Sequence, residues 1–157
     1  MSPVIRSNWI LVALVMLMSL AIYNHFRQQH DVLSPITPLD THLISRIEIR
    51  HNGTITAKLR RQKDIWIDAA SGQPAKNPDR LNKLLHIAQL PSLYRFPAAD
   101  HDLQAFGLMP PRFELKLDDT ELRIGGLDPA SGLRYAQTGN QIHLISDSYT
   151  HYLSQQP

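Results

Sequence analysis

The chain carries eight histidines, the side chains best suited to hold a metal ion, but their spacing does not form a ligand set. The nearest two are five residues apart, which does not place them on one face of a helix. The densest polar cluster is Asp100-His101-Asp102, which we interpret as the start of a short helix through Phe106, capped by Asp100. Cysteine is absent, which excludes disulfides, thiolate metal sites and a cysteine nucleophile. We therefore expect no metal site.

The other reactive side chains form no arrangement typical of an enzyme. Asp118-Asp119 falls at a predicted hairpin tip, where the turn accounts for both acids. The serines lack the nucleophile-elbow pattern, and no helix follows Gly125-Gly126 to complete a phosphate cradle. We predict no catalytic residues and no bound cofactor, so an anchored hydrolase is the weakest of the hypotheses considered.

The basic side chains are the remaining candidates for function. A formal net charge of +2 argues against a nucleic-acid partner. The charge is uneven, however, because residues 43–96 carry +6 and residues 97–157 carry −4. Solvated strands that carry cations against edge aggregation are one explanation. The other is an interaction surface for an acidic partner or anionic lipid, formed by Arg46, Arg50, Lys58, Arg60, Arg61 and Lys63.

An apolar segment near the N-terminus indicates a membrane anchor. Residues 9–26 contain no Asp, Glu, Lys or Arg, and as a helix they span roughly 27 Å, close to a hydrocarbon core of about 30 Å. Trp9 at one end and Tyr23 with Phe26 at the other resemble the aromatic belts of membrane helices. We predict a tail over residues 1–8 and a single transmembrane helix over 9–26.

A cleaved signal peptide is the alternative for this segment. Arg6 would then lie in its charged region, and Ser19-Leu20-Ala21 would be its small-residue cleavage site. Positive charge is slightly greater before the segment than after it, where Arg27 stands, which favours a C-terminal part outside the cytoplasm. Residues 27–42 contain two prolines and predict a semi-extended tether.

Residues 43–157 predict an α+β domain of antiparallel meanders with short packed helices. Apolar and charged residues alternate over 46–50 and over 55–60, and a third short strand is predicted over 64–68. Asn77-Pro78 is a typical helix start, and Pro91 ends the helix. Its apolar stripe is formed by Leu81, Leu84, Leu85 and Ala88.

The first hairpin requires a choice of register. A three-residue loop from His51 to Gly53 keeps the apolar side chains of both strands on one face. This register places Ile49 opposite Ile55 and Arg46 opposite Lys58, with Gly53 in a left-handed conformation.

The second half predicts two more hairpins. Gly107 is expected to end a helix with a positive φ, and residues 113–117 alternate as a strand. In the first of these hairpins we predict Leu115 opposite Ile124 and Leu117 opposite Leu122. The elements that follow are a loop over 125–132, strands over 133–137 and 142–145, and a short helix capped by Asp147.

Several motifs in this half resemble the bacterial domain-of-unknown-function 4340 family. They are Leu103-x-x-Phe106-Gly107-Leu108, Pro111, Leu122-x-Ile124-Gly125 and Gly132-x-x-Tyr135. Upstream, Ile47-x-Ile49, Leu59, Trp66 and the helix after Pro78 resemble the same unit. The resemblance implies a bacterial inner-membrane helix and an exported domain in the periplasm. Some members are encoded beside ABC-type export or gliding-motility transporter parts. The activity of the family is unknown, so the resemblance assigns no catalytic residue.

Two hypotheses follow. The first is a membrane-anchored, non-enzymatic envelope protein that docks onto a membrane complex as an accessory subunit. The second is a periplasmic lipid- or glycan-binding module with its ligand in a cleft between two α+β units. A flat basic or apolar face favours the first hypothesis, and a deep apolar cleft with a few polar groups favours the second.

Overall fold

The computed structural model describes residues 12, 14–21, 34–149 and 151–154, in two units, Met1–Leu33 and Ser34–Pro157. In the first unit, Val12 and residues 14–21 are helical. None of the helices within the described residues has both the length and the apolar character needed to cross a membrane. Half of the predicted anchor, residues 9–11, 13 and 22–26, lies outside the described residues.

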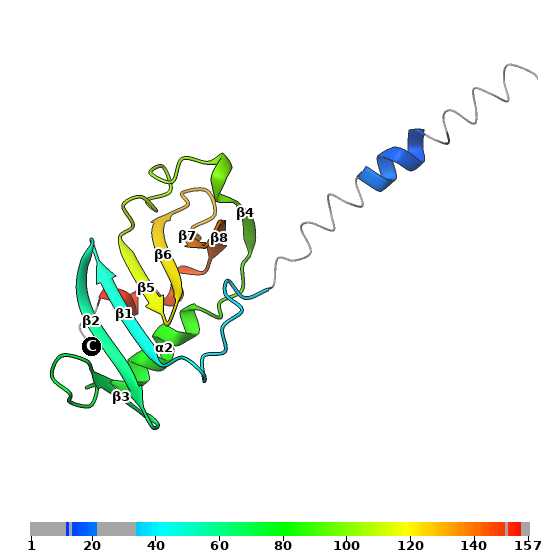
Figure 1. The fold of residues 1–157 in the computed structure, drawn as a ribbon. Coiled ribbons are helices and arrows are strands. Elements are labelled where there is room, and N and C mark those ends of the chain that lie inside the picture. The colour runs from blue at the N-terminus through cyan, green and yellow to red at the C-terminus, as the bar shows by residue number, and fades with distance from the viewer. Residues whose placement is uncertain (1–11, 13, 22–33, 150, 155–157) are drawn as a thin grey trace, which may run out of the picture. The chain divides into compact units, whose positions relative to one another are not determined.

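The second unit is built on one antiparallel sheet of eight strands (Figure 1), which confirms the α+β prediction. The strand order is β3-β2-β1-β5-β6-β7-β8-β4, so strands from both halves of the sequence share the sheet. The strands are β1 (Arg46–His51), β2 (Thr54–Gln62), β3 (Ile65–Asp68), β4 (Tyr94–Pro97), β5 (Phe113–Leu117), β6 (Thr120–Leu127), β7 (Arg134–Thr138) and β8 (Gln141–Ile145).

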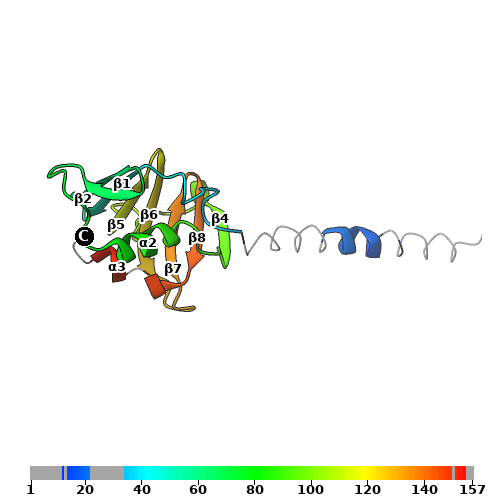
Figure 2. The ribbon, with the colours of Figure 1, turned by 90° about the horizontal axis from the view of Figure 1, so that it is seen from below.

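Two α-helices pack together on one face of this sheet, α2 (Pro78–Ile87) and α3 (His151–Ser154) (Figure 2). Short 3-10 helices cover Ala98–Asp100 and Asp147–Tyr149. Helix α2 begins as predicted, because the Asn77 side-chain oxygen accepts a hydrogen bond from the Arg80 backbone N–H at 3.0 Å.

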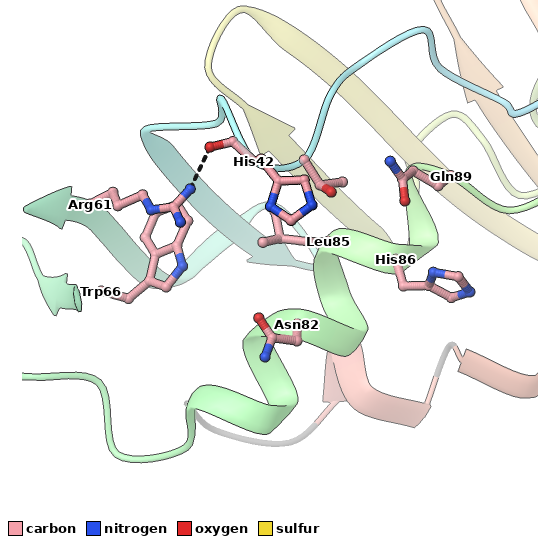
Figure 3. A pocket seen from close by; sticks show the side chains of 8 residues that line it. His42, Arg61, Trp66, Asn82, Leu85, His86 and Gln89 are labelled. Carbon is pink, nitrogen blue, oxygen red and sulfur yellow. Dashed lines mark hydrogen bonds between the residues drawn. The ribbon is translucent and has the colours of Figure 1, made fainter. Parts of the chain in front are cut away.

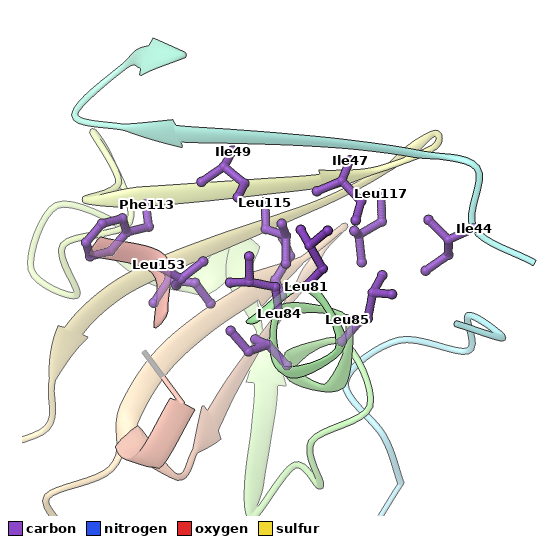
Figure 4. Packing of buried hydrophobic residues seen from close by; sticks show 14 of the residues in the cluster. Ile44, Ile47, Ile49, Leu81, Leu84, Leu85, Phe113, Leu115, Leu117 and Leu153 are labelled. Atoms are coloured by element: carbon purple, nitrogen blue, oxygen red, sulfur yellow. The ribbon is translucent and has the colours of Figure 1, made fainter. Parts of the chain in front are cut away.

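The core lies between α2 and the sheet (Figure 4). Leu81, Leu84 and Leu85 project from the helix onto the inner face of the sheet, the face that α2 covers. All three are at most 7% exposed. Their partners on β1 and β5 are Ile47, Ile49, Leu115 and Leu117. Burial of these alternating strand residues is the main force that orients the sheet.

The first hairpin differs from its predicted register. Asn52 and Gly53 form a two-residue turn with φ of 49° and 75°, so the left-handed Gly53 is confirmed. The register shifts before Arg50, which leaves Thr56 as an extra residue in β2. This bulge restores the alternation, and Ile49 lies opposite Ala57 rather than Ile55. The predicted pairing of Ile49 with Ile55, and of Arg46 with Lys58, is therefore wrong.

The hairpin of β5 and β6 is also displaced from the prediction, by two residues. Leu115 lies opposite Leu122, and the turn is formed by Asp118 and Asp119. Asp118 adopts a φ of 49°, and its carboxylate accepts hydrogen bonds from the Ser45 and Arg46 backbone N–H groups. A shift of two residues keeps the same side chains on the inner face, so alternation alone does not distinguish the two registers.

The compact unit begins before the predicted domain. Ile36 and Thr37, which we assigned to the tether, are 3% and 1% exposed. The Ile36 backbone N–H donates to the Leu90 carbonyl at 3.0 Å, and the Thr37 hydroxyl donates to the Ala88 carbonyl at 2.8 Å. This segment therefore packs on the end of α2.

Other local predictions are corrected as well. Residues 103–107 form consecutive turns rather than a helix, and Asp102, not Asp100, accepts the capping hydrogen bond from the Gln104 N–H at 3.0 Å. Gly107 has the predicted positive φ, 66°, although it ends turns and not a helix. Gly125-Gly126 belongs to β6 rather than a loop, and residues 94–97, where no strand was predicted, form the edge strand β4.

Candidate functional site

Four of the six predicted interaction residues share one surface. Arg46, Arg50, Lys58 and Arg60 lie on the face of β1 and β2 that points away from α2, because they alternate with core residues. We use the name outer face for this side of β1 and β2 and for the same side of the neighbouring strands β5 and β6. The Arg46, Lys58 and Arg50 side chains are 68%, 52% and 42% exposed.

The outer face carries acids from the second half of the chain beside the bases of the first. Glu114 on β5 lies 3.5 Å from the Arg50 guanidinium. The β5–β6 turn places Asp118 and Asp119 each 3.6 Å from Arg46. Antiparallel pairing of β1 with β5 brings these residues together. The predicted basic patch is thus a mosaic of both charges.

Glu48 is the centre of this mosaic. Its carboxylate lies 3.1 Å from Lys58 Nζ and 2.7 Å from an Arg50 guanidinium nitrogen. The hydrogen bond from Lys58 lowers the pKa of Glu48 below its usual value. Partial desolvation opposes this shift in pKa, and the Arg50 guanidinium reinforces it. A shallow hollow of about 340 Å³ lies beside it, with Arg46, Arg60, Lys116 and Asp118 in its lining.

The other two predicted residues lie elsewhere. Arg61 is half-buried on the inner face, where its guanidinium lies 5.8 Å from the Trp66 ring centroid. Lys63 is exposed in the tight turn between β2 and β3, with a φ of 57°. The sequence run Arg60-Arg61 is therefore split between the two faces of the sheet, as strand geometry requires.

A groove beside α2, which the sequence did not reveal, is a second candidate site (Figure 3). It measures about 330 Å³ and lies between the inner face of β2 and β3, residues 41–42 and the exposed side of α2. Asn82 and His86 are four residues apart in the sequence, which places both side chains on the same face of α2. This face forms the helical wall of the groove. Arg61 and Trp66 form the strand wall, and only the tertiary structure shows that they lie beside α2.

A third hollow of about 690 Å³ is lined partly by Gly107, Gly125 and Gly126. These glycines allow a close approach of residues 106–107 to β6. A β-carbon on Gly125 would lie 2.3 Å from the Phe106 carbonyl oxygen, which accepts a hydrogen bond from the Gly126 N–H at 2.8 Å. Packing explains why glycine stands at these positions.

In the described part of the chain, no three His, Asp or Glu residues gather to hold a metal ion. His101 packs edge-on against Phe96, with ring centroids 4.7 Å apart. His143 is buried on β8, with Nδ1 2.9 Å from the Ser92 hydroxyl oxygen. Burial, with a smaller effect of the Arg95 charge, lowers the pKa of His143 to about 4.

The sheet also bears on the predicted cleft between two α+β units. Because β1 pairs with β5, one sheet and one main core run through both halves of the sequence, and the described residues of the compact unit do not divide into two units with a cleft between them.

Comparisons of the chain with protein-family models, curated proteins and solved structures find no match. The resemblance to the domain-of-unknown-function 4340 family stays a prediction.

Proposed function

We propose that this chain is a membrane-anchored, non-enzymatic protein of the bacterial envelope that docks onto a membrane complex as an accessory subunit. Residues 9–26 would hold it in the inner membrane, with the compact unit in the periplasm. The observation that carries the proposal is the outer face, where the exposed charges of Arg50 and Lys58 lie on the side of the sheet away from α2. An ABC-type export complex is the partner that the family resemblance suggests.

The charges of the outer face favour a protein partner over a lipid surface. Anionic membranes attract clusters of uncompensated cations. Here Arg46, Arg50 and Lys58 already have acidic neighbours within 4.0 Å. A fixed pattern of both signs instead selects a partner with the complementary pattern and sets its orientation.

Arg60→Glu is the test for this surface. Arg60 is exposed and lies opposite Arg46, so the reversal removes a like-charge pair and is expected to leave folding intact. Lys76→Glu is the matched control, because Lys76 is exposed in the loop before α2. After cross-linking in cells, several-fold less partner protein should co-purify with the Arg60→Glu variant than with the parent. The Lys76→Glu variant should co-purify as much partner protein as the parent does.

Equal recovery of partners by Arg60→Glu and the parent would exclude the outer face as the contact surface. Sedimentation with anionic vesicles separates the lipid alternative, since loss of vesicle binding with unchanged cross-linking indicates a lipid surface. The anchor is tested by the mass of the membrane-extracted protein. A mature N-terminus at Ile22 would show that the segment is cleaved.

A further inference from the structure

The groove beside α2 is rich in hydrogen-bond donors and lacks acids. Its lining contains a guanidinium, two imidazoles, two side-chain amides and a hydroxyl, but no carboxylate. The outer face, by contrast, mixes both signs of charge. The described lining consists of Thr41, His42, Arg61, Trp66, Asn82, Leu85, His86 and Gln89.

Arg61 is held in place within this groove. One guanidinium nitrogen donates to the His42 carbonyl oxygen at 2.6 Å, and the group also lies over the Trp66 ring. No acidic group of the described residues lies within 4.0 Å of it. A positioned guanidinium without a carboxylate partner is well suited to bind an oxyanion, because its planar fork donates two parallel hydrogen bonds.

The helical wall adds further hydrogen-bond donors on another side. Asn82 and His86 project from α2, and Gln89 follows in the turn that ends the helix. The His86 ring is held edge-on to Tyr149, with centroids 5.1 Å apart. Figure 3 shows Arg61 and Trp66 on one side of His42, and His86 and Gln89 on the other.

We propose that this groove binds a phosphate group, either of a small phosphomonoester or of a phospholipid head group. A tetrahedral phosphate has oxygens that point in several directions, so it can accept hydrogen bonds from the strand wall and the helical wall together. A volume of about 330 Å³ accommodates the phosphate and a small attached group. A sugar that stacks on Trp66 fits less well, because this residue is only 9% exposed and the Arg61 guanidinium lies over its ring.

This inference is independent of the docking proposal, because the groove is on the inner face and Arg60 on the outer. The chain has two tryptophans, so full-length protein with Trp9→Phe in non-ionic detergent leaves Trp66 as the only reporter. Inorganic phosphate and glycerol phosphate are titrated at constant ionic strength, with chloride as the control anion. A saturable change in Trp66 fluorescence is expected with both phosphates and not with chloride.

Arg61→Gln should weaken phosphate binding at least tenfold, and Asn82→Ala several-fold. The matched control is Arg60→Gln, which removes the same charge one residue away on the opposite face and should leave the affinity unchanged. Asn82 is exposed on α2, so its variant tests the site even if Arg61→Gln disturbs the fold. Circular dichroism monitors folding.

The proposal is overturned if the parent shows no saturable response, or if Arg60→Gln and Arg61→Gln weaken binding equally. Unchanged affinity in Asn82→Ala also overturns it, because the helical wall would then take no part. Phosphatidylglycerol in mixed micelles with the same detergent identifies the source of the phosphate. Competition by this lipid, with none by a glycolipid that lacks phosphate, supports a lipid head group, and tight binding of glycerol phosphate without competition by the lipid supports a soluble ligand.

Discussion

Lys58 lies directly opposite Glu48 on neighbouring strands, with its Nζ 3.1 Å from Glu48 Oε2. The same carboxylate holds Arg50 at 2.7 Å. One acid therefore compensates two of the cations in the predicted basic patch. This relationship depends on the Thr56 bulge, because the two-residue turn without the bulge would set Lys58 opposite Ile47.

Lys58→Glu should consequently lower the free energy of unfolding. The reversal places two carboxylates directly opposite each other, which costs up to about 1 kcal/mol in an exposed strand pair. Arg60→Glu, which relieves a like-charge contact with Arg46, should not destabilise the fold. Urea unfolding of both variants measures the difference.

The double reversal Glu48→Lys with Lys58→Glu is the control for that experiment. It restores opposite charges at the pair, although it also places a lysine beside Arg50, so it should recover part of the lost stability. If Lys58→Glu is as stable as Arg60→Glu, the ion pair makes no net contribution, as is common for exposed pairs.

Gly125→Ala should be the most damaging of the glycine substitutions. Its β-carbon would lie 2.3 Å from the Phe106 carbonyl oxygen, so the backbone must move, at a cost of roughly 3 kcal/mol. Gly107→Ala combines a positive φ with a contact of 3.0 Å to the Gly126 nitrogen. Gly53→Ala has a positive φ but open space, and should cost only about 1 kcal/mol. Denaturation midpoints should follow this order, and equal midpoints would contradict it.

Stability should fall as the pH is lowered from 6.5 toward 4. The native His143 stays neutral because its pKa is about 4, whereas in the unfolded chain it binds a proton near its usual 6.5. The unfolded state therefore binds more protons in this window and is favoured as pH falls. The lowered pKa values of Glu48 and Asp118 act at more acidic pH, where protonation removes their stabilisation.

His143→Gln isolates this effect. Glutamine can keep a hydrogen bond to Ser92 and does not titrate. The thermal midpoint of the parent should drop more between pH 6.5 and 4.5 than that of the variant. Parallel pH profiles would show that His143 is protonated in the folded protein or contributes nothing.

Asn77→Ala should lower stability by about 1 kcal/mol, since it leaves the Arg80 backbone N–H without its side-chain acceptor. Asn77→Asp keeps an acceptor at the same position and should retain most of the stability. Helicity and urea midpoints of the two variants provide the measurement. Equal losses of stability in both variants would indicate that the Asn77 side chain stabilises the fold through a contact other than the helix cap.

The sequence alone determined the elements whose signals are local. Asn77-Pro78 starts α2 where predicted, and the alternation over 113–117 predicted β5 with its correct bounds. Gly139 lies with a φ of 53° in the turn of the predicted last hairpin. In each case a cap, a turn or an apolar period within a few residues favours one conformation, because the relevant contacts are close in the chain.

Only the tertiary structure decided the registers and the surfaces. A bulge at Thr56 and a shift of two residues in β6 preserve the burial pattern, so alternation is compatible with more than one pairing. Four of the six predicted basic residues do share a face, but their acidic neighbours come from β5 and its turn. That arrangement results from pairing of β1 with β5, strands more than sixty residues apart. Burial of one shared core against α2 favours this pairing of β1 with β5. No short stretch of sequence contains all the residues that contribute to that burial.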